Sequence, residues 1–272
     1  MIVKKSPQEV DKMAAAGAIL VATLDLLQSK IRPGVRTEEL DRAAERFIRS
    51  HGATPSFKGY RGFPGSICTS PESLVVHGIP GPYRLSAGEV VSVDVGVTLD
   101  GWVADAARTF AVGEISYASD NLLRTTESAL HAGIERARPG NRVGDVSHAI
   151  QRVAEGAGLA VIRSLVGHGV GREMHEEPQV PNFGPPAKGP LLEEGMVLAI
   201  EPMTCAGRPE IRVGGDGWAV FTQDGSQSAH FEATVAVTDG EPRVLTPWHL
   251  SPELRGQAQR SAPPAQRELS PS

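Results

Sequence analysis

"RPGVRTEELDRAAERFIRSHG", residues 32–52, and "RPGNRVGDVSHAIQRVAEGAG", residues 138–158, are two versions of one pattern. The offset between them is constant, 138 less 32 or 106 residues, so that Arg36 pairs with Arg142 and Gly52 with Gly158. In each version an Arg-Pro-Gly turn leads into a helix with periodic apolar residues, which a glycine then ends. Two helical segments can resemble each other by chance, but a constant offset with the same turn residues favours an internal duplication.

Each version also has the same kinds of neighbours. Before the first, Ser6-Pro7-Gln8-Glu9 is a capping box with proline at the first helical position. After it, Leu99-Asp100-Gly101 is a hairpin turn between two apolar segments. The expected helices before the two versions cover 7–29 and about 119–137, and the expected strands cover 89–97, 102–110, 196–204, 218–222 and 230–237. The pattern predicts an α/β (α+β) fold in which two helix-helix-antiparallel-strand halves share one sheet.

The duplication also predicts the domain organisation. We expect a single domain over residues 1–248, with halves of about 1–115 and 116–248. Beyond Trp248 the sequence is rich in Pro, Ser, Gln and Ala, so residues 249–272 are expected to form a disordered tail.

Composition excludes several classes of function. The 272 residues carry a net charge of −5 and no basic run, which argues against nucleic-acid binding. The longest apolar stretch, Ala14 to Leu24, is too short to cross a bilayer, and the N-terminal segment has acids as well as lysines, unlike a signal peptide. Cys68 and Cys205 are far apart and form no disulfide or zinc pattern, so a reducing cytoplasm is the expected location.

Four acids fall within apolar segments that are expected to be strands. Asp94 lies among valines, Asp105 lies in the returning strand of the hairpin, Glu201 follows "MVLAI" and Glu232 lies in "HFEATVAV". Carboxylates are costly to bury unless a partner or a cation compensates them. Solvated edge acids are the alternative, yet the flanking apolar residues favour a cation site, which one histidine would complete. Such a site suits Mn(II), Fe(II) or Co(II), with Zn(II) compatible, and two ions sharing a water could generate a nucleophile.

Five ordered motifs add a resemblance to a known family. "VVHGIPG", "VDVGVTLDGWVADAARTF", "GHGVGREMHEEPQVPNFG", "EEGMVLAIEP" and "SAHFEATVAVT" together resemble bacterial type I methionine aminopeptidases over about residues 3–246. The resemblance implies the pseudo-twofold pita-bread fold of the creatinase/aminopeptidase class. It also implies a hydrolase that removes the initiator methionine from nascent chains with a small second residue, with two divalent ions per subunit. The partners that it implies are peptide N-termini, with the ribosome surface as a further candidate. The enzyme is expected to be a monomer.

The resemblance assigns roles residue by residue. It implies that Asp105 and Glu232 bridge two ions, that Asp94 completes one site, and that His168 and Glu201 complete the other. Glu201 would also act as general base toward the water that bridges the ions, and the resulting hydroxide would attack the scissile carbonyl. His77 and His175 would bind substrate and stabilise the transition state without holding metal. The implied pocket for the methionine side chain consists of Phe57, Tyr60, Phe63, Cys68, Met174 and Trp218.

The sequence departs from the common family pattern at several positions. His230 replaces a usual glutamine, Ala233 a usual histidine, "SPES" at 70–73 a segment that usually holds asparagine, and Met174 a frequent phenylalanine. These changes leave the five implied ligands in place. They put in doubt a monovalent-cation loop and the hydrogen bonds behind the metal ligands, and they fit a secondary paralogue as well as a housekeeping enzyme.

Structural interpretations remain open for several of these residues. His51, His131 and His148 are expected to be structural because they fall on helices or at helix ends, whereas His230 could equally support the site. Tyr60, Phe63 and Trp218 could be core residues, and Cys68 has no neighbouring base that would make it a nucleophile. Two other functions compete with methionine removal: an X-Pro aminopeptidase or prolidase-like peptidase, and a non-catalytic binding protein with the same fold.

Overall fold

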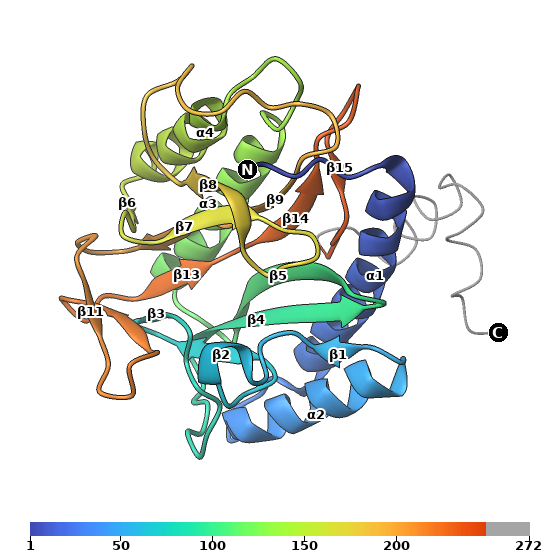
Figure 1. The fold of residues 1–272 in the computed structure, drawn as a ribbon. Coiled ribbons are helices and arrows are strands. Elements are labelled where there is room, and N and C mark those ends of the chain that lie inside the picture. The colour runs from blue at the N-terminus through green and yellow to red at the C-terminus, as the bar shows by residue number, and fades with distance from the viewer. Residues whose placement is uncertain (249–272) are drawn as a thin grey trace.

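The structure is a computed structural model that describes residues 1–248, so the expected tail at 249–272, with His249, lies outside the described residues. Figure 1 shows two helix pairs at opposite ends of the molecule, with the strands between them. The expected α/β class is confirmed.

The helices keep the period of the duplication. Helix α1 (Pro7–Lys30) begins at Ser6, whose capping box with Glu9 is formed as expected. Helices α2 (Thr37–Ser50) and α4 (Val143–Gly156) both contain 14 residues, and they begin and end at equivalent positions of the two sequence copies. Helix α3 (Tyr117–Ile134) begins two residues before the expected range and ends three residues before its end, because Ser116 supplies the N-terminal cap.

The two strands of the hairpin in the first half are continuous. The turn residues Asp100 and Gly101 both have positive φ, 50° and 75°, as a tight two-residue hairpin turn requires. The strands are β1 (Thr54–Pro55), β2 (Cys68–Pro71), β3 (Leu74–Val76), β4 (Val90–Leu99) and β5 (Trp102–Ala111), with a 3-10 turn at Tyr60–Gly62. Strand β4 pairs with β1, β2 and β5, all antiparallel.

The second half corrects two expectations. The expected strand 196–204 is split into β9 (Val197–Ile200) and β10 (Met203–Cys205), since Pro202 has no N–H to offer a ladder. The expected strand 230–237 is also split, into β13 (Ser228–His230) and β14 (Ala233–Ala236), so that Glu232 lies in the break. The other strands are β6 (Ala160–Val161), β7 (Val166–Gly169), β8 (Glu176–Pro181), β11 (Ile211–Val213), β12 (Val220–Thr222, shorter than the expected 218–222) and β15 (Arg243–Val244). One sheet of this half has the order β15-β14-β9-β7-β8.

Hydrogen bonds along β5 join the two halves. The Thr234 hydroxyl accepts from Asp105 N (2.9 Å) and donates to Asp105 O (2.7 Å). Two residues further along, Glu232 N donates to Ala107 O at 2.9 Å. At the next step His230 N donates to the Thr109 hydroxyl (2.9 Å), which in turn donates to His230 O (2.8 Å). We call this row of bonds the seam. One hydrophobic core extends through both halves around it.

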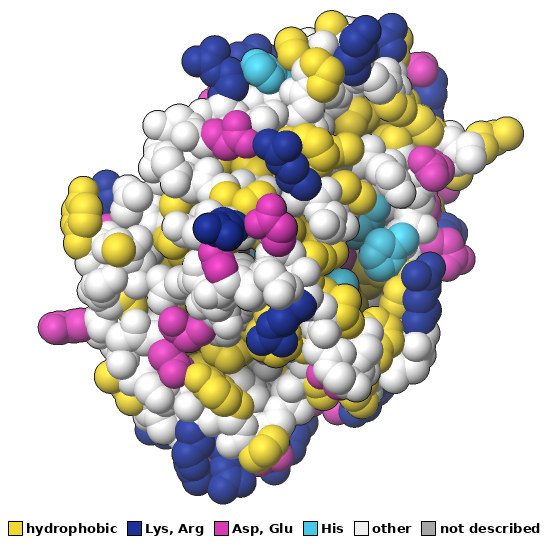
Figure 2. Space-filling view, turned by 90° about the vertical axis from the view of Figure 1, so that its left-hand side faces the viewer, with side chains coloured by type: hydrophobic (Ala, Val, Ile, Leu, Met, Phe, Trp, Pro, Cys, Tyr) yellow, Lys and Arg dark blue, Asp and Glu magenta, His cyan; other side chains and the backbone are white. Residues whose placement is uncertain are grey.

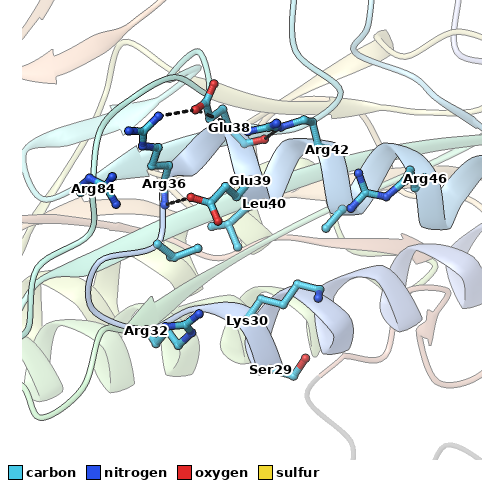
Figure 3. Close-up of a pocket in the computed structure, with 12 residues that line it drawn as sticks. Ser29, Lys30, Arg32, Arg36, Glu38, Glu39, Leu40, Arg42, Arg46 and Arg84 are labelled. Atoms are coloured by element: carbon cyan, nitrogen blue, oxygen red, sulfur yellow. Dashed lines mark hydrogen bonds and ion pairs between the residues drawn. The ribbon is translucent and has the colours of Figure 1, made fainter.

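A separate basic cavity lies outside the seam. Its volume is about 670 Å³, and it lies between the end of α1 and the first turns of α2 (Figure 3). Lys30, Arg32, Arg46 and Arg84 line it together with an Arg36–Glu38 ion pair of 3.2 Å. It contains none of the expected site residues. Within residues 1–248, no helix combines the length and apolar character needed to span a membrane.

Candidate metal centre

The hairpin of the first half places two acids on one face of the sheet. Asp94 pairs across the ladder with Ala107, and Asp105 pairs with Gly96, so the two acids are diagonal neighbours rather than directly opposite each other. Asp105 is 4% exposed. One carboxylate oxygen of each acid, Oδ1 in both, is buried without a hydrogen-bond partner among the described residues.

His168 approaches these acids from the second half. Strand β7 ends with this residue and Gly169, and His168 pairs with Ala199 of β9. Its Nδ1 lies 2.9 Å from Gly169 O, so Nδ1–H donates to that carbonyl and Nε2 keeps its lone pair. Nε2 lies 3.9 Å from Asp105 Oδ2 and 3.5 Å from Glu201 Oε1. A ligand atom on a neutral imidazole is thereby directed at the acids.

The two remaining acids lie at the strand breaks. Glu201 follows β9, and its carbonyl accepts a hydrogen bond of 3.0 Å from Asn182 Nδ2. Glu232 is 2% exposed, and its carbonyl accepts a bond of 2.7 Å from Trp248 Nε1. These backbone bonds fix the direction of both side chains although neither residue lies in a ladder.

Burial and mutual repulsion act together on the four acids. Burial raises the pKa of Asp105 to about 7. Burial and then the charge of Asp105 raise the pKa values of Asp94, Glu201 and Glu232 well above their ordinary ranges. Without a cation, these groups therefore hold protons in a pH range in which exposed acids are ionised.

A divalent cation fits this arrangement. Asp105, His168 and Glu232 each offer a ligand atom, and these atoms lie within 4.8 Å of one another. The unpartnered oxygens of Asp94, Asp105 and Glu232 are the kind of buried acceptor that a cation satisfies. Several carboxylates with an imidazole form a donor set suited to Mn(II), Fe(II), Co(II) or Zn(II).

The two other expected histidines lie at the edge of this cluster. The His175 ring lies 4.2 Å from that of His168, and its Nδ1 lies 2.9 Å from the Tyr60 hydroxyl. Burial, and then the nearby His168 and Arg61, lower the pKa of His175 to about 4. His77 has a φ of 60° and lies edge-on to Trp218, with 6.4 Å between the rings, and burial lowers its pKa. Both rings are therefore neutral near pH 7, and each can offer an N–H to a substrate.

The expected pocket residues form two groups beside the acids. Phe57, Tyr60 and Met174 belong to one apolar cluster. The Phe63 and Trp218 rings are 5.1 Å apart and nearly perpendicular. Cys68 lies opposite Asp94 in the β2–β4 ladder, and burial followed by the Asp94 charge raises the pKa of its thiol, which opposes a nucleophilic role. Figure 2 shows histidine side chains gathered in a hollow bordered by hydrophobic ones.

Sequence reasoning missed Gly96 and Lys5. A Cβ on Gly96 would lie 2.8 Å from both the Met174 methyl and the Phe57 ring, so the missing side chain leaves room for these residues. Glycine inside a valine-rich strand was the available signal. The Lys5 ammonium forms a buried 2.6 Å ion pair with Glu176, next to His175, and no local pattern indicates a contact over that chain separation.

The fold and the donor set together describe a metallopeptidase, and residues 11–239 match metallopeptidase family M24, to which the chain therefore belongs. Within that class the similarity to methionine aminopeptidases is high. The chain is 53% identical to the methionine aminopeptidase of Clostridium perfringens over 246 residues, which is 90% of this chain and 99% of that protein. It superposes on the crystal structure of methionine aminopeptidase from Rickettsia prowazekii with a TM-score of 0.89 and 40% identity, covering 90% of this chain and 100% of the other.

A more distant structure has a similar fold at low sequence identity. Prolidase from Pyrococcus furiosus superposes with a TM-score of 0.72 at 22% identity, and the match covers 90% of this chain but 65% of that one. At this identity the likeness concerns the fold alone. The expected pita-bread fold and membership of a metallopeptidase family are confirmed.

Proposed function

We propose that this enzyme removes N-terminal methionine from peptides and nascent polypeptides whose second residue is small. The observation that carries the proposal is the convergence of Asp105, His168 and Glu232 in a chain of family M24 that is similar to methionine aminopeptidases over nearly its whole described length. An X-Pro activity has only fold-level likeness in its favour.

We assign five residues to two divalent ions. Asp105 and Glu232 would contact both ions, Asp94 would complete one site, and His168 with Glu201 would complete the other. Bound there, the ions would lower the pKa of water and polarise the scissile carbonyl. Mn(II), Fe(II) and Co(II) suit the oxygen-rich donor set, and Zn(II) is compatible with it.

The side chains of the protein then handle the proton and the substrate. Glu201 is largely buried, with 13% of its side chain exposed, and would take the proton of the attacking water. His175 and His77 carry neutral rings, so their N–H groups can donate to the substrate carbonyl or orient its amide.

The apolar walls would bind the methionine side chain. Phe57, Tyr60 and Met174, together with Phe63, Cys68 and Trp218, would form a surface of aromatic and sulfur-containing groups that suits a thioether. Gly96 would keep this space open.

The test is methionine release from Met-Ala-Ser and Met-Gly-Ser, compared with cleavage of Ala-Pro-Ser, in the presence of Mn(II) or Co(II). Glu201→Gln should lower kcat about 10³-fold, the range of a lost general base. Glu155→Gln, on the exposed face of α4, is the matched control and should retain full activity. Preferential cleavage of Ala-Pro-Ser would replace the proposal with an X-Pro peptidase.

We extend the proposal to the setting of the enzyme. Residues 1–248 would act as one catalytic domain and as a monomer in the cytoplasm. The ribosome surface is the partner we propose, since nascent N-termini appear there. Sedimentation of the purified protein, alone and with ribosomes, tests both points.

A further inference from the structure

His230 has a backbone that is fixed on two sides. It ends β13 and pairs with Met203 of β10. On its other side it is joined to Thr109 through the seam, by two hydrogen bonds that involve its own N–H and C=O. The direction of the side chain therefore follows from the strands and not from a mobile loop.

The imidazole is directed toward the acids of the metal centre. His230 is 2% exposed, and its Nε2 is buried without a hydrogen-bond partner within residues 1–248. Nε2 lies 3.7 Å from Glu201 Oε2 and 3.9 Å from Glu232 Oε2. An unpartnered buried nitrogen is costly, and it requires an explanation when it lies between two carboxylates.

These distances fit a shared ion better than a hydrogen bond. Hydrogen bonds between nitrogen and oxygen are about 2.7–3.2 Å long, shorter than either separation. Two ligand atoms that each lie about 2.1 Å from one ion are separated by about 3–4 Å at ordinary coordination angles. His168 Nε2 has the same relation to its neighbours, at 3.5 Å from Glu201 Oε1 and 3.9 Å from Asp105 Oδ2.

We propose that His230 is a ligand of the metal centre through Nε2, so that the centre has two imidazoles, with His168 beside one oxygen of Glu201 and His230 beside the other. The inference deepens the proposed function and rests on it for the presence of a divalent ion. A second nitrogen shifts the donor set toward Co(II), Fe(II) and Zn(II) and away from Mn(II), which prefers oxygen.

The test counts imidazole ligands without using activity. X-ray absorption spectra of the full-length protein, loaded with one and then two equivalents of Co(II) or Zn(II), report the imidazoles bound per metal ion, and the metal content converts this number to imidazoles per protein. We expect two in the unsubstituted protein, and one in His230→Gln and in His168→Gln. Calorimetric titration should show that His230→Gln weakens Co(II) and Zn(II) binding about tenfold or more, with a smaller change for Mn(II).

Matched variants identify the second nitrogen. His77→Gln and His175→Gln remove the neighbouring rings and should leave the count at two, as should His148→Gln on α4, far from the centre. A count of one in the unsubstituted protein overturns the inference even if His230→Gln does not fold. It is also overturned if His230→Gln leaves the count at two, or if His77→Gln or His175→Gln lowers it.

The outcome is separate from that of the proposed function. Two imidazoles in a protein that releases no methionine would leave the ligand assignment standing and refute the activity. One imidazole in a protein that releases methionine would refute the ligand assignment and leave the proposed activity standing.

Discussion

The two halves of the molecule supply the same centre in different ways. In the first half, Asp94 and Asp105 lie within β4 and β5, two ten-residue strands paired along their whole length. In the second half, His168 is the last residue but one of the short strand β7, His230 ends the short strand β13, and Glu201 and Glu232 lie in breaks. A long ladder holds the first pair, whereas short ladders hold the two histidines and single hydrogen bonds hold the carbonyls of Glu201 and Glu232.

The difference indicates that the two halves position their ligands by different structural means. A continuous ladder fixes two carboxylates close together despite their repulsion, because the backbone bonds of the hairpin are many and regular. Residues outside a ladder can turn their side chains toward a point that ladder geometry does not reach, but each then needs its own partner, such as Asn182 for the Glu201 carbonyl. The hydrogen bonds of the seam fix the backbone at His230, Glu232 and Thr234 relative to strand β5 of the first half.

The largest expected effect comes from the ladder itself. Asp105→Asn keeps the shape of the side chain but removes the negative charge of the carboxylate that we propose to contact both ions. We expect kcat/KM for a Met-Ala peptide to fall on the order of a thousandfold, which corresponds to several kcal/mol of lost stabilisation, and the metal content to fall with it. Steady-state kinetics and metal analysis measure both.

Asp100→Asn is the control on the same hairpin. Asp100 lies in the turn with a φ of 50°, a conformation that asparagine adopts readily, and its side chain is remote from the acids. It should keep full activity. Equal losses in both variants would mean that the hairpin as a whole, and not the Asp105 charge, was damaged.

Metal removal should make stability depend on pH. Without an ion, burial raises the pKa of Asp105 from 3.8 to about 7. An acid with a higher pKa in the folded chain stabilises the fold at low pH, and this contribution is lost as the pH rises from the ordinary value of 3.8 to the folded-state value of about 7. We therefore expect the Tm of chelator-treated protein to fall by several degrees between about pH 4 and 7. Added Co(II) should remove the fall, and a flat profile without metal would contradict the repulsion described above.

The seam provides a smaller and more selective test. Thr234→Val keeps the volume but removes the hydroxyl that serves Asp105 N and O. We expect a loss of about 2 kcal/mol in the free energy of unfolding and a ten- to hundredfold fall in kcat. Urea unfolding and kinetics measure the two effects.

Thr126→Val separates the two effects. The Thr126 hydroxyl is buried on α3, where it lies 2.6 Å from that of Thr204 and donates to Leu122 O at 2.7 Å. This variant should lose similar stability but keep its kcat. A fall in kcat in both variants would show that activity follows stability and not the seam.

The sequence alone predicted the duplicated helices, because their offset and caps are local and repeated. It predicted continuous strands at 196–204 and 230–237, which was wrong. Pro202 offered a signal for the first break, since proline cannot donate to a ladder. The second break has no such signal: "HFEATVAV" alternates like a strand, and the bonds from Phe231 to Pro202 and from Glu232 to Ala107 decide its path.

The site shows the same limit. Acids in apolar segments indicated a cation site, and the family resemblance assigned the individual ligands. The role of His230 stayed open because its Nε2 lies near the carboxylates of both Glu201 and Glu232, which only the folded chain brings together. Gly96 is significant only through two residues that lie far from it along the chain.

Gly96→Ala should have the smallest effect. It tests the packing of β4 of the first half against Met174 of the second half. The added methyl would lie 2.8 Å from the Met174 methyl and the Phe57 ring, and Gly96 does not have a positive φ, so packing alone opposes it. Met174 can move because its side chain is flexible, but it would move into the pocket. We expect KM for Met-Ala-Ser to rise about tenfold, the effect of a few CH₂-sized contacts, while kcat and metal content change little. Gly156→Ala, where a Cβ meets nothing within 4 Å, is the matched control and should change neither constant. If Gly96→Ala lowered kcat and metal content instead, the ladder would be the sensitive element, and the pocket would not extend to Gly96.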